Sequence, residues 1–198
     1  KGQVSSDAEN LVICAWNDLK LVEEAFRRNP GQIAALMTEP IMCNCGGIMP
    51  KPGFLEGLRE LCTKNGALLI FDEVITGFRV DIGGAQKLFG VTPDVATFAK
   101  GMAGGFPVSA IAGKREYMKS FGDLSITHAG TYNSHAPCMA ATLAALEALS
   151  ANNAALLQNA HAMGKQLMAG IAEIGRKAGK AMHIRGVPTA FFVSFGDK

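Results

Sequence analysis

Short apolar runs alternate with amphipathic segments along this 198-residue chain. Apolar runs bounded by Gly, Pro, Asn or Asp are typical of strands buried on both faces of a sheet. They predict strands over residues 11–16, 33–38, 67–71, 94–99, 108–113 and 190–195. Apolar residues at helical spacing predict helices over 19–28, 54–65, 114–121, 136–149 and 154–179, the last with a bend.

Strands that are separated by helices predict an α/β fold, with three α/β/α layers around a mostly parallel sheet. Residues 40–53 are rich in Gly and Pro and predict a loop. Between 179 and 185 the long helical pattern gives way to a strand pattern. We therefore expect a domain boundary there, with one unit over 1–180 and a second beginning at 181–198.

The composition narrows the classes of function. Hydrophobic residues make up 48% of the chain and charged residues 18%, which excludes a disordered chain. The net charge is only +2, so neither nucleic acid nor an anionic membrane is an expected partner. Five cysteines without regular spacing predict free thiols in a cytoplasmic protein. The pair Cys43 and Cys45 has no second pair at zinc spacing, so we expect no metal site.

The stretch 68-LLIFDEVITGF-78 runs from a buried strand directly into two carboxylates, Asp72 and Glu73. Lys100 follows the predicted strand over 94–99 in the same way. Ligands of parallel α/β sheets bind at the carboxyl ends of the strands, so Asp72 and Lys100 could face one crevice. An amine in a partly desolvated pocket can form a Schiff base with an aldehyde cofactor, and an acid can pair with a protonated ring nitrogen. Pyridoxal phosphate requires both.

Each of these residues also has a simpler interpretation. An Asp after a strand often caps a helix or forms a turn, and a Lys before glycines is often a solvated surface charge. The loop over 101–107 contains three glycines that let the backbone approach a ligand, but it is no nucleotide-binding motif. In the loop over 129–135, Thr131 could hold a phosphate at the start of the long helix. Alternatively, Thr131, Asn133 or Ser134 only caps the helix.

Four segments resemble the class-III, fold-type-I pyridoxal-phosphate aminotransferases. They are 39-EP-40, 55-LEGLRELCTKNGALLIFDEVITGFRV-80, 90-GVTPDVATFAKGMAGGFPVSAIAGKRE-116 and 129-AGT-131. Within the family, they are most similar to glutamate-1-semialdehyde 2,1-aminomutases. The resemblance implies a homodimeric enzyme that transfers an amino group with pyridoxal 5′-phosphate. Its substrate would be a small amino acid, amino-aldehyde or keto compound.

The resemblance also implies a role for individual residues. Lys100 would form the Schiff base and carry the proton, and Asp72 would pair with the pyridine nitrogen. Val74 would pack on the ring. Thr131 would bind the cofactor phosphate, in this family usually that of the neighbouring subunit. Asn44 would lie close to the phenolic oxygen of the cofactor.

Chains of this family are longer, so the resemblance implies a fragment. Residues 1–180 would be part of the pyridoxal-phosphate-binding large domain, and 181–198 would begin the small C-terminal domain. The family's phosphate loop and its ring-stacking aromatic residue have no counterpart here. A truncated, non-catalytic module that acts only through its dimer surface is therefore an alternative to an enzyme.

Overall fold

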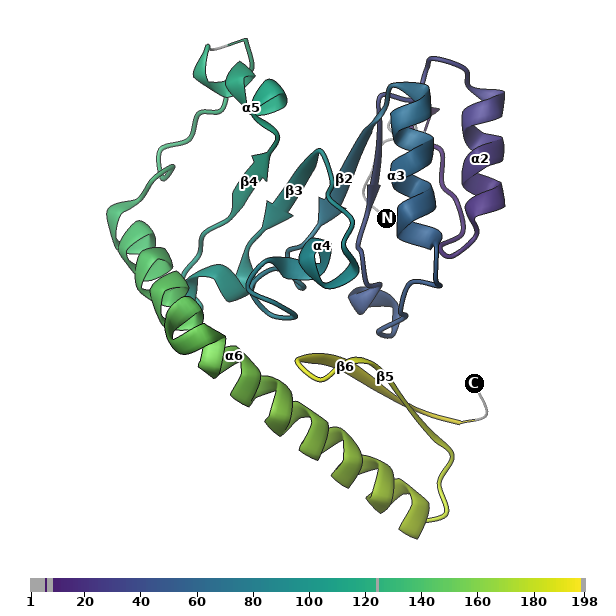
Figure 1. The fold of residues 1–198 in the computed structure, drawn as a ribbon, viewed down its shortest axis with the longest axis vertical. Helices are drawn as coiled ribbons and strands as arrows, with labels where there is room; N and C mark the ends of the chain where they lie inside the picture. The colour runs from purple at the N-terminus through teal and green to yellow at the C-terminus, as the bar shows by residue number, and fades with distance from the viewer. Residues whose placement is uncertain (1–5, 7–8, 124, 197–198) are drawn as a thin grey trace.

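The computed structural model describes residues 6, 9–123 and 125–196 of the chain. A four-stranded sheet and a separate two-stranded hairpin organise these residues (Figure 1). The strands are β1 (Ala35–Thr38), β2 (Leu68–Asp72), β3 (Val95–Phe98), β4 (Ala110–Gly113), β5 (Met182–Val187) and β6 (Ala190–Phe195).

The larger sheet has the strand order β1-β2-β3-β4. Strands β1, β2 and β3 are parallel, and β4 runs antiparallel to β3. The register pairs Phe71 with Ala96 and Asp72 with Thr97 across β2 and β3. The predicted α/β class with a mostly parallel sheet is confirmed. The carboxyl ends of the three parallel strands meet at one edge of the sheet.

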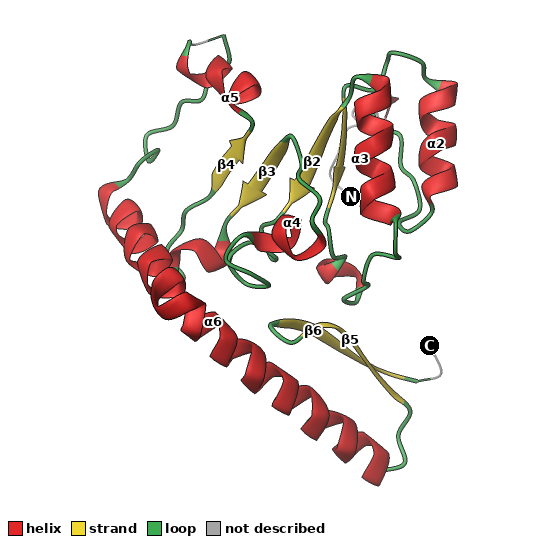
Figure 2. Cartoon of the chain, viewed as in Figure 1, coloured by secondary structure: helices red, strands yellow, loops and turns green. Residues whose placement is uncertain are grey.

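Five helices and two short 3-10 turns connect the strands in the described part of the chain (Figure 2). The Asp18 side chain caps α2 (Leu19–Arg28) by accepting a hydrogen bond from the Leu21 N–H at 3.1 Å. No helix within the described ranges is long and apolar enough to cross a bilayer. The bounds are α2 (Leu19–Arg28), α3 (Phe54–Asn65), α4 (Gly84–Phe89), α5 (Arg115–Gly122), α6 (Ala136–Lys177), η1 (Cys43–Cys45) and η2 (Lys100–Ala103).

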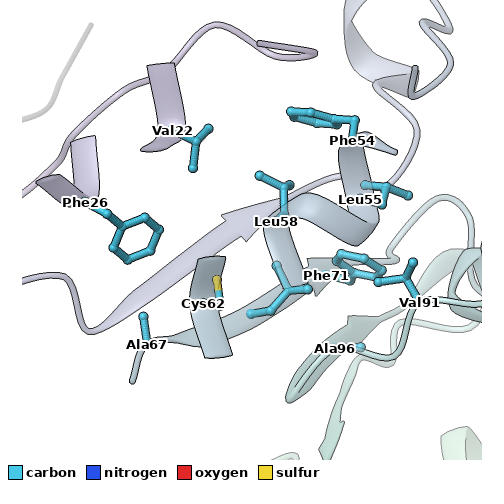
Figure 3. Packing of buried hydrophobic residues seen from close by; sticks show 11 residues of the cluster. Val22, Phe26, Phe54, Leu55, Leu58, Cys62, Ala67, Phe71, Val91 and Ala96 are labelled. Carbon is cyan, nitrogen blue, oxygen red and sulfur yellow. The ribbon is translucent and has the colours of Figure 1, made fainter. Parts of the chain in front are cut away.

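The core lies between helices α2 and α3 and the sheet (Figure 3). Leu69 and Phe71 of β2 are fully buried there, and Leu58 of α3 is 1% exposed. Burying each of these side chains contributes about 1.5–3 kcal/mol. Strand β2 is thereby held firmly up to its last residue, Asp72.

The predicted strand over 11–16 is wrong. No strand forms there, and Leu11, Val12 and Ile13 are exposed. Among the described residues β1 is the edge strand on that side, and the apolar run does not pair with its free edge. Trp16 contacts the edge through a side chain instead, donating its indole N–H to the Thr38 hydroxyl at 3.0 Å. An apolar run alone therefore does not fix whether a segment joins a sheet ladder.

The two helices predicted near the end of the chain are confirmed: the range α6 consists of two helical segments separated by a kink. The kink lies at residues 151–154, where the backbone is not helical and Asn152, Asn153 and Ala154 have φ values of 50°, 57° and 58°. Asn adopts this left-handed conformation more readily than most residues, which explains the pair at the kink. The break lies between the two predicted helices, whereas the sequence predicted a bend within the second of them.

The start of α6 also differs from one interpretation of the sequence. His135 is the N-cap residue, and no side chain caps the helix, so capping by Thr131, Asn133 or Ser134 is wrong. Pro137 is the second helical residue. It has no N–H, which removes one of the donors that a cap normally satisfies.

Candidate active site

The carboxyl ends of β2 and β3 bring Asp72 and Lys100 to the same edge of the sheet. Asp72 is the last residue of β2 and faces Thr97 in the register. Lys100 opens η2 only three residues after Thr97, so no more than roughly 10 Å of chain separates them. Asp72 and Lys100 therefore lie close to the carboxyl ends of two neighbouring strands.

The loops after the two strands touch each other. A Cβ on Gly101 would lie 3.2 Å from the carbonyl oxygen of Gly77, so a larger residue would crowd this contact. Lys100 has a φ of 39°, in the left-handed region that costs a non-glycine residue energy. Its side chain is exposed and forms no ion pair with any described residue. The local fold thus holds an unpaired amine at the strand end despite backbone strain.

The Asp72 carboxylate is only partly engaged. Its Oδ1 accepts a hydrogen bond from the Val74 N–H at 3.0 Å and one from the Thr97 hydroxyl at 3.4 Å. The first bond makes Asp72 a turn residue, as the simpler interpretation expected. No donor in the described part of the chain reaches Oδ2. One oxygen is therefore used by the fold and the other is available to a ligand.

Glu73, in contrast, is fully buried and fully engaged. Its carboxylate accepts hydrogen bonds from the Thr76 hydroxyl at 2.9 Å, the Ala85 N–H at 2.5 Å, the Gln86 N–H at 3.2 Å and the Gln86 side-chain amide at 3.1 Å. These bonds attach the start of α4 to the end of β2. Glu73 explains why a second acid follows the strand, a role that sequence reasoning missed because its partners lie up to 13 residues away.

The turn η1 adds a third group to this edge. The Cys43 N–H donates to the Glu39 carboxylate at 3.1 Å, which ties the turn to the end of β1. Burial raises the pKa of the Cys43 thiol to about 11, and the charge of Glu39 adds to this shift, while the charges of Arg79 and Lys100 oppose it. The Cys43 thiol therefore lies within electrostatic range of Lys100. Asn44, the next residue, is exposed on the same turn.

The β5–β6 hairpin supports η1 from the other side. Gly47 has a φ of 66°, and a Cβ there would lie 2.9 Å from the Arg185 carbonyl oxygen and 3.3 Å from the Phe192 Cβ. Only glycine permits this close approach of the two backbones. The hairpin therefore contributes to the position of the turn that carries Asn44.

Two further predicted residues have different placements. Val74 follows Asp72 and Glu73 directly and is half-buried. Thr131 is exposed in the loop before α6, and its side chain forms no hydrogen bond with the described residues. Asp72, Val74, Lys100 and the η1 turn gather at one edge, and no contact joins Thr131 to them within this single chain.

No group of three or more His, Cys, Asp or Glu side chains in the described part of the chain could hold a metal ion. A cavity of about 520 Å³ lies beside the free edge of β1 and is lined by Trp16, Phe26 and Phe54 among others. It includes neither Asp72 nor Lys100, so the concentration of polar chemistry lies at the strand ends and not in this cavity.

Comparison with known proteins assigns the family. A model of the class-III aminotransferases matches residues 5–196. The chain belongs to the class-III aminotransferase family. It is 44% identical over 179 residues to glutamate-1-semialdehyde 2,1-aminomutase 2 of Brevibacillus brevis, covering 90% of this chain and 41% of that protein. It is 40% identical over 197 residues to the glutamate-1-semialdehyde 2,1-aminomutase of Methanosphaera stadtmanae, covering 99% and 46%.

Solved structures agree with this assignment. An omega-transaminase from Sphaerobacter thermophilus superimposes with a TM-score of 0.92 at 32% identity, covering all of this chain and 45% of that one. A transaminase with PLP bound superimposes with a TM-score of 0.90 at 28% identity, covering 97% and 45%. This class-III chain thus has the fold of these enzymes but spans less than half the length of the relatives it matches.

The residues of this class-III chain fit one part of pyridoxal phosphate. Asp72 Oδ2 is a carboxylate oxygen without a partner among the described residues, which suits a protonated ring nitrogen. Lys100 offers an amine without an ion pair, which suits an aldehyde. The two groups come from neighbouring strand ends, so they suit the two ends of one ring.

Proposed function

We propose that this chain carries the lysine-bearing part of a pyridoxal-phosphate site for amino-group transfer, as an aminotransferase or a glutamate-1-semialdehyde 2,1-aminomutase-like enzyme. One observation carries the proposal: the unpaired Lys100 amine and the free Asp72 Oδ2 lie at adjoining strand ends. Membership of the class-III family supports it. Because the chain spans less than half of its relatives, the proposal concerns this part of the site.

Pyridoxal phosphate, when bound, supplies an aldehyde that condenses with amines and an electron-poor ring that accepts an electron pair. Lys100 Nζ holds the cofactor covalently and, once released, takes up a proton and returns it. Asp72 Oδ2 accepts the hydrogen bond of the ring N–H and keeps that nitrogen protonated. Val74 packs on one face of the ring, which orients it between the two polar residues.

The remaining roles complete the proposed site. Asn44 contacts the phenolic oxygen from the η1 turn, which the Glu39 bond holds near Lys100. Thr131 binds the phosphate of the neighbouring subunit, so a homodimer is needed for a complete site. The exposed Thr131 side chain is compatible with a partner outside this chain. The substrate is a small amino acid, amino-aldehyde or keto compound, and nucleic acid and membranes are not partners.

We also propose the domain division expected from the sequence. Residues 1–180 form part of the large domain, and residues 181–198 begin the small domain. The separation of the β5–β6 hairpin from the four-stranded sheet supports this division. We place the chain in the cytoplasm, because all five of its cysteines are free thiols.

Trapping of the cofactor tests the function. The chain is incubated with pyridoxal phosphate and reduced with borohydride, which makes a lysine–cofactor bond permanent, and the modified peptide is identified by mass spectrometry. We expect the adduct on Lys100 and its loss in Lys100→Ala. Lys64→Ala is the matched control, because Lys64 is exposed at the end of α3 and outside the site. An adduct spread equally over surface lysines would contradict the proposal.

A dimerising module without catalysis is the second candidate. It is favoured by the short span of the chain relative to the family and by apolar side chains exposed on α6, such as Leu143, Leu167 and Ile174. It predicts no adduct on Lys100 at millimolar cofactor, together with a dimer in size-exclusion chromatography. A Lys100 adduct excludes this candidate as the whole function.

A further inference from the structure

Thr97 lies opposite Asp72 in the parallel ladder of β2 and β3. Its hydroxyl lies 3.4 Å from Asp72 Oδ1, and it is half-buried at the carboxyl end of the sheet. A β-branched residue is common in a strand for packing alone, but Val or Ile would serve that purpose equally well. The hydroxyl directed at the carboxylate distinguishes Thr97 from a residue that only fills the strand.

The two oxygens of Asp72 are used unequally. Oδ1 receives both available donors, the Val74 N–H from its own chain segment and the Thr97 hydroxyl from the neighbouring strand. Two donors from different directions fix the rotation of the carboxylate plane, which a single donor would leave freer. The orientation leaves Oδ2 without a donor in the described part of the chain.

We propose that Thr97 is a positioning residue that locks the Asp72 carboxylate so that Oδ2 faces the ring N–H of the cofactor. This inference rests on the proposed function. Thr97 touches neither substrate nor cofactor and acts only through Asp72. Without its hydroxyl, the carboxylate can turn and offer either oxygen, so part of the preorganisation for the ring nitrogen is lost.

The test compares two probes in the full 198-residue chain. One is pyridoxamine phosphate, which has no aldehyde and so binds without a lysine bond. The other is its analogue in which the ring nitrogen is replaced by C–H. Thr97→Val removes the hydroxyl and keeps the branched shape, while Thr97→Ser keeps the hydroxyl. Dissociation constants are measured by isothermal titration calorimetry.

We expect Thr97→Val to raise the dissociation constant of pyridoxamine phosphate about 5-fold, because one hydrogen bond contributes about 1 kcal/mol. Binding of the C–H analogue should be unchanged, and Thr97→Ser should restore the wild-type value for the first probe. In an Asp72→Ala background, Thr97→Val should cause no further loss. Equal weakening of both probes, or a Ser variant as weak as the Val variant, would overturn the inference.

A second measurement needs no cofactor. The carboxyl resonance of Asp72 is followed by carbon-13 NMR and assigned with Asp72→Asn. It should move in Thr97→Val and return to its wild-type position in Thr97→Ser, with the fold of each variant checked by amide spectra. An unchanged resonance in Thr97→Val would overturn the positioning role. If the wild-type chain binds neither probe, the proposed function fails, and the NMR result still decides whether Thr97 orients Asp72.

Discussion

The two ends of the four-stranded sheet use the same kinds of residue for opposite purposes. At the amino end, Asp94 precedes β3 and pairs with Arg59 at 2.7 Å and Lys114 at 2.6 Å. At the carboxyl end, Asp72 and Lys100 form no ion pair with any described residue. An acid and a lysine are thus joined at one end and kept apart at the other.

The difference lies in how completely each acid is satisfied. Asp94 also accepts the Leu69 N–H at 2.8 Å, and its side chain is only 3% exposed. Burial alone would raise the pKa of Asp94, but the bonds from Lys114, Leu69 and Arg59 outweigh it and hold that pKa below its ordinary value. The amino end stabilises the fold, whereas the carboxyl end keeps an oxygen and an amine available.

The largest expected effect follows from removing the acid at the amino end. Asp94→Ala leaves the Leu69 N–H unsatisfied and two cations without their partner. We expect a loss of about 3 kcal/mol in the free energy of unfolding, measured by urea denaturation. Asp72→Ala is the matched control and should cost less than about 1 kcal/mol while abolishing selective binding of the ring nitrogen. Equal losses of stability in both variants would remove the distinction between the two ends.

Glu73 gives the next largest expected effect, because it is fully buried and its carboxylate anchors the start of α4. In Glu73→Gln, an amide N–H₂ replaces an oxygen that accepts hydrogen bonds at the start of α4. We expect a loss of about 2 kcal/mol, since a buried donor loses its acceptor. Hydrogen exchange should show faster opening at Ala85 and Gln86 and little change in β2. Unchanged protection of these two amides would show that Glu73 does not anchor α4.

The pH dependence of the free energy of unfolding tests the role of the Asp94 charge, with a smaller expected effect than the removal of the side chain. Its pKa is lower in the folded chain than the ordinary value of about 3.9. The folded chain therefore stabilises the ionised form of Asp94. This contribution to the free energy of unfolding is complete above about pH 4 and is lost as the pH falls through the pKa of Asp94 in the folded chain. Asp94→Asn should be less stable at neutral pH, and its free energy of unfolding should change less with pH in this acidic range. Parallel curves for the wild type and the variant would contradict this assignment.

The smallest effect concerns the Cys43 thiol, whose pKa of about 11 reports on its charged neighbours. Arg79→Ala removes an opposing positive charge that persists at this pH and should raise this pKa further, whereas Glu39→Gln should lower it. The measurement is the pH dependence of iodoacetamide alkylation at Cys43, followed by peptide mass spectrometry in a Cys45→Ser background. Lys64→Ala should leave the curve in place. An unchanged curve in both Arg79→Ala and Glu39→Gln would show that these two charges do not act on the thiol.

The sequence predicted most of the elements that have strong local signals. Helix α2 was predicted with its exact bounds, Asp18 caps it, and β2 was displaced by only one residue. Helix α4 and strand β5 were missed. The first is only six residues long and is anchored by distant Glu73, and the second mixes polar and apolar residues in MHIRGV. The partner of α4 lies 12 residues away, so the local pattern carries no sign of it, whereas β5 pairs with the adjacent strand β6 and was missed because its own residues form no continuous apolar run.

The sequence by itself determined the α/β class and the family and led to the proposal of Asp72 and Lys100, because periodicity and motif are local properties of the chain. The tertiary structure alone decided that Glu73 is structural while Asp72 keeps Oδ2 free, and that Thr97 and Cys43 belong to the same edge. These outcomes depend on which hydrogen-bond donors and charges the fold brings together from residues up to 57 positions apart in the sequence. Whether a carboxylate is saturated or available is fixed by such contacts, and no residue carries that information alone.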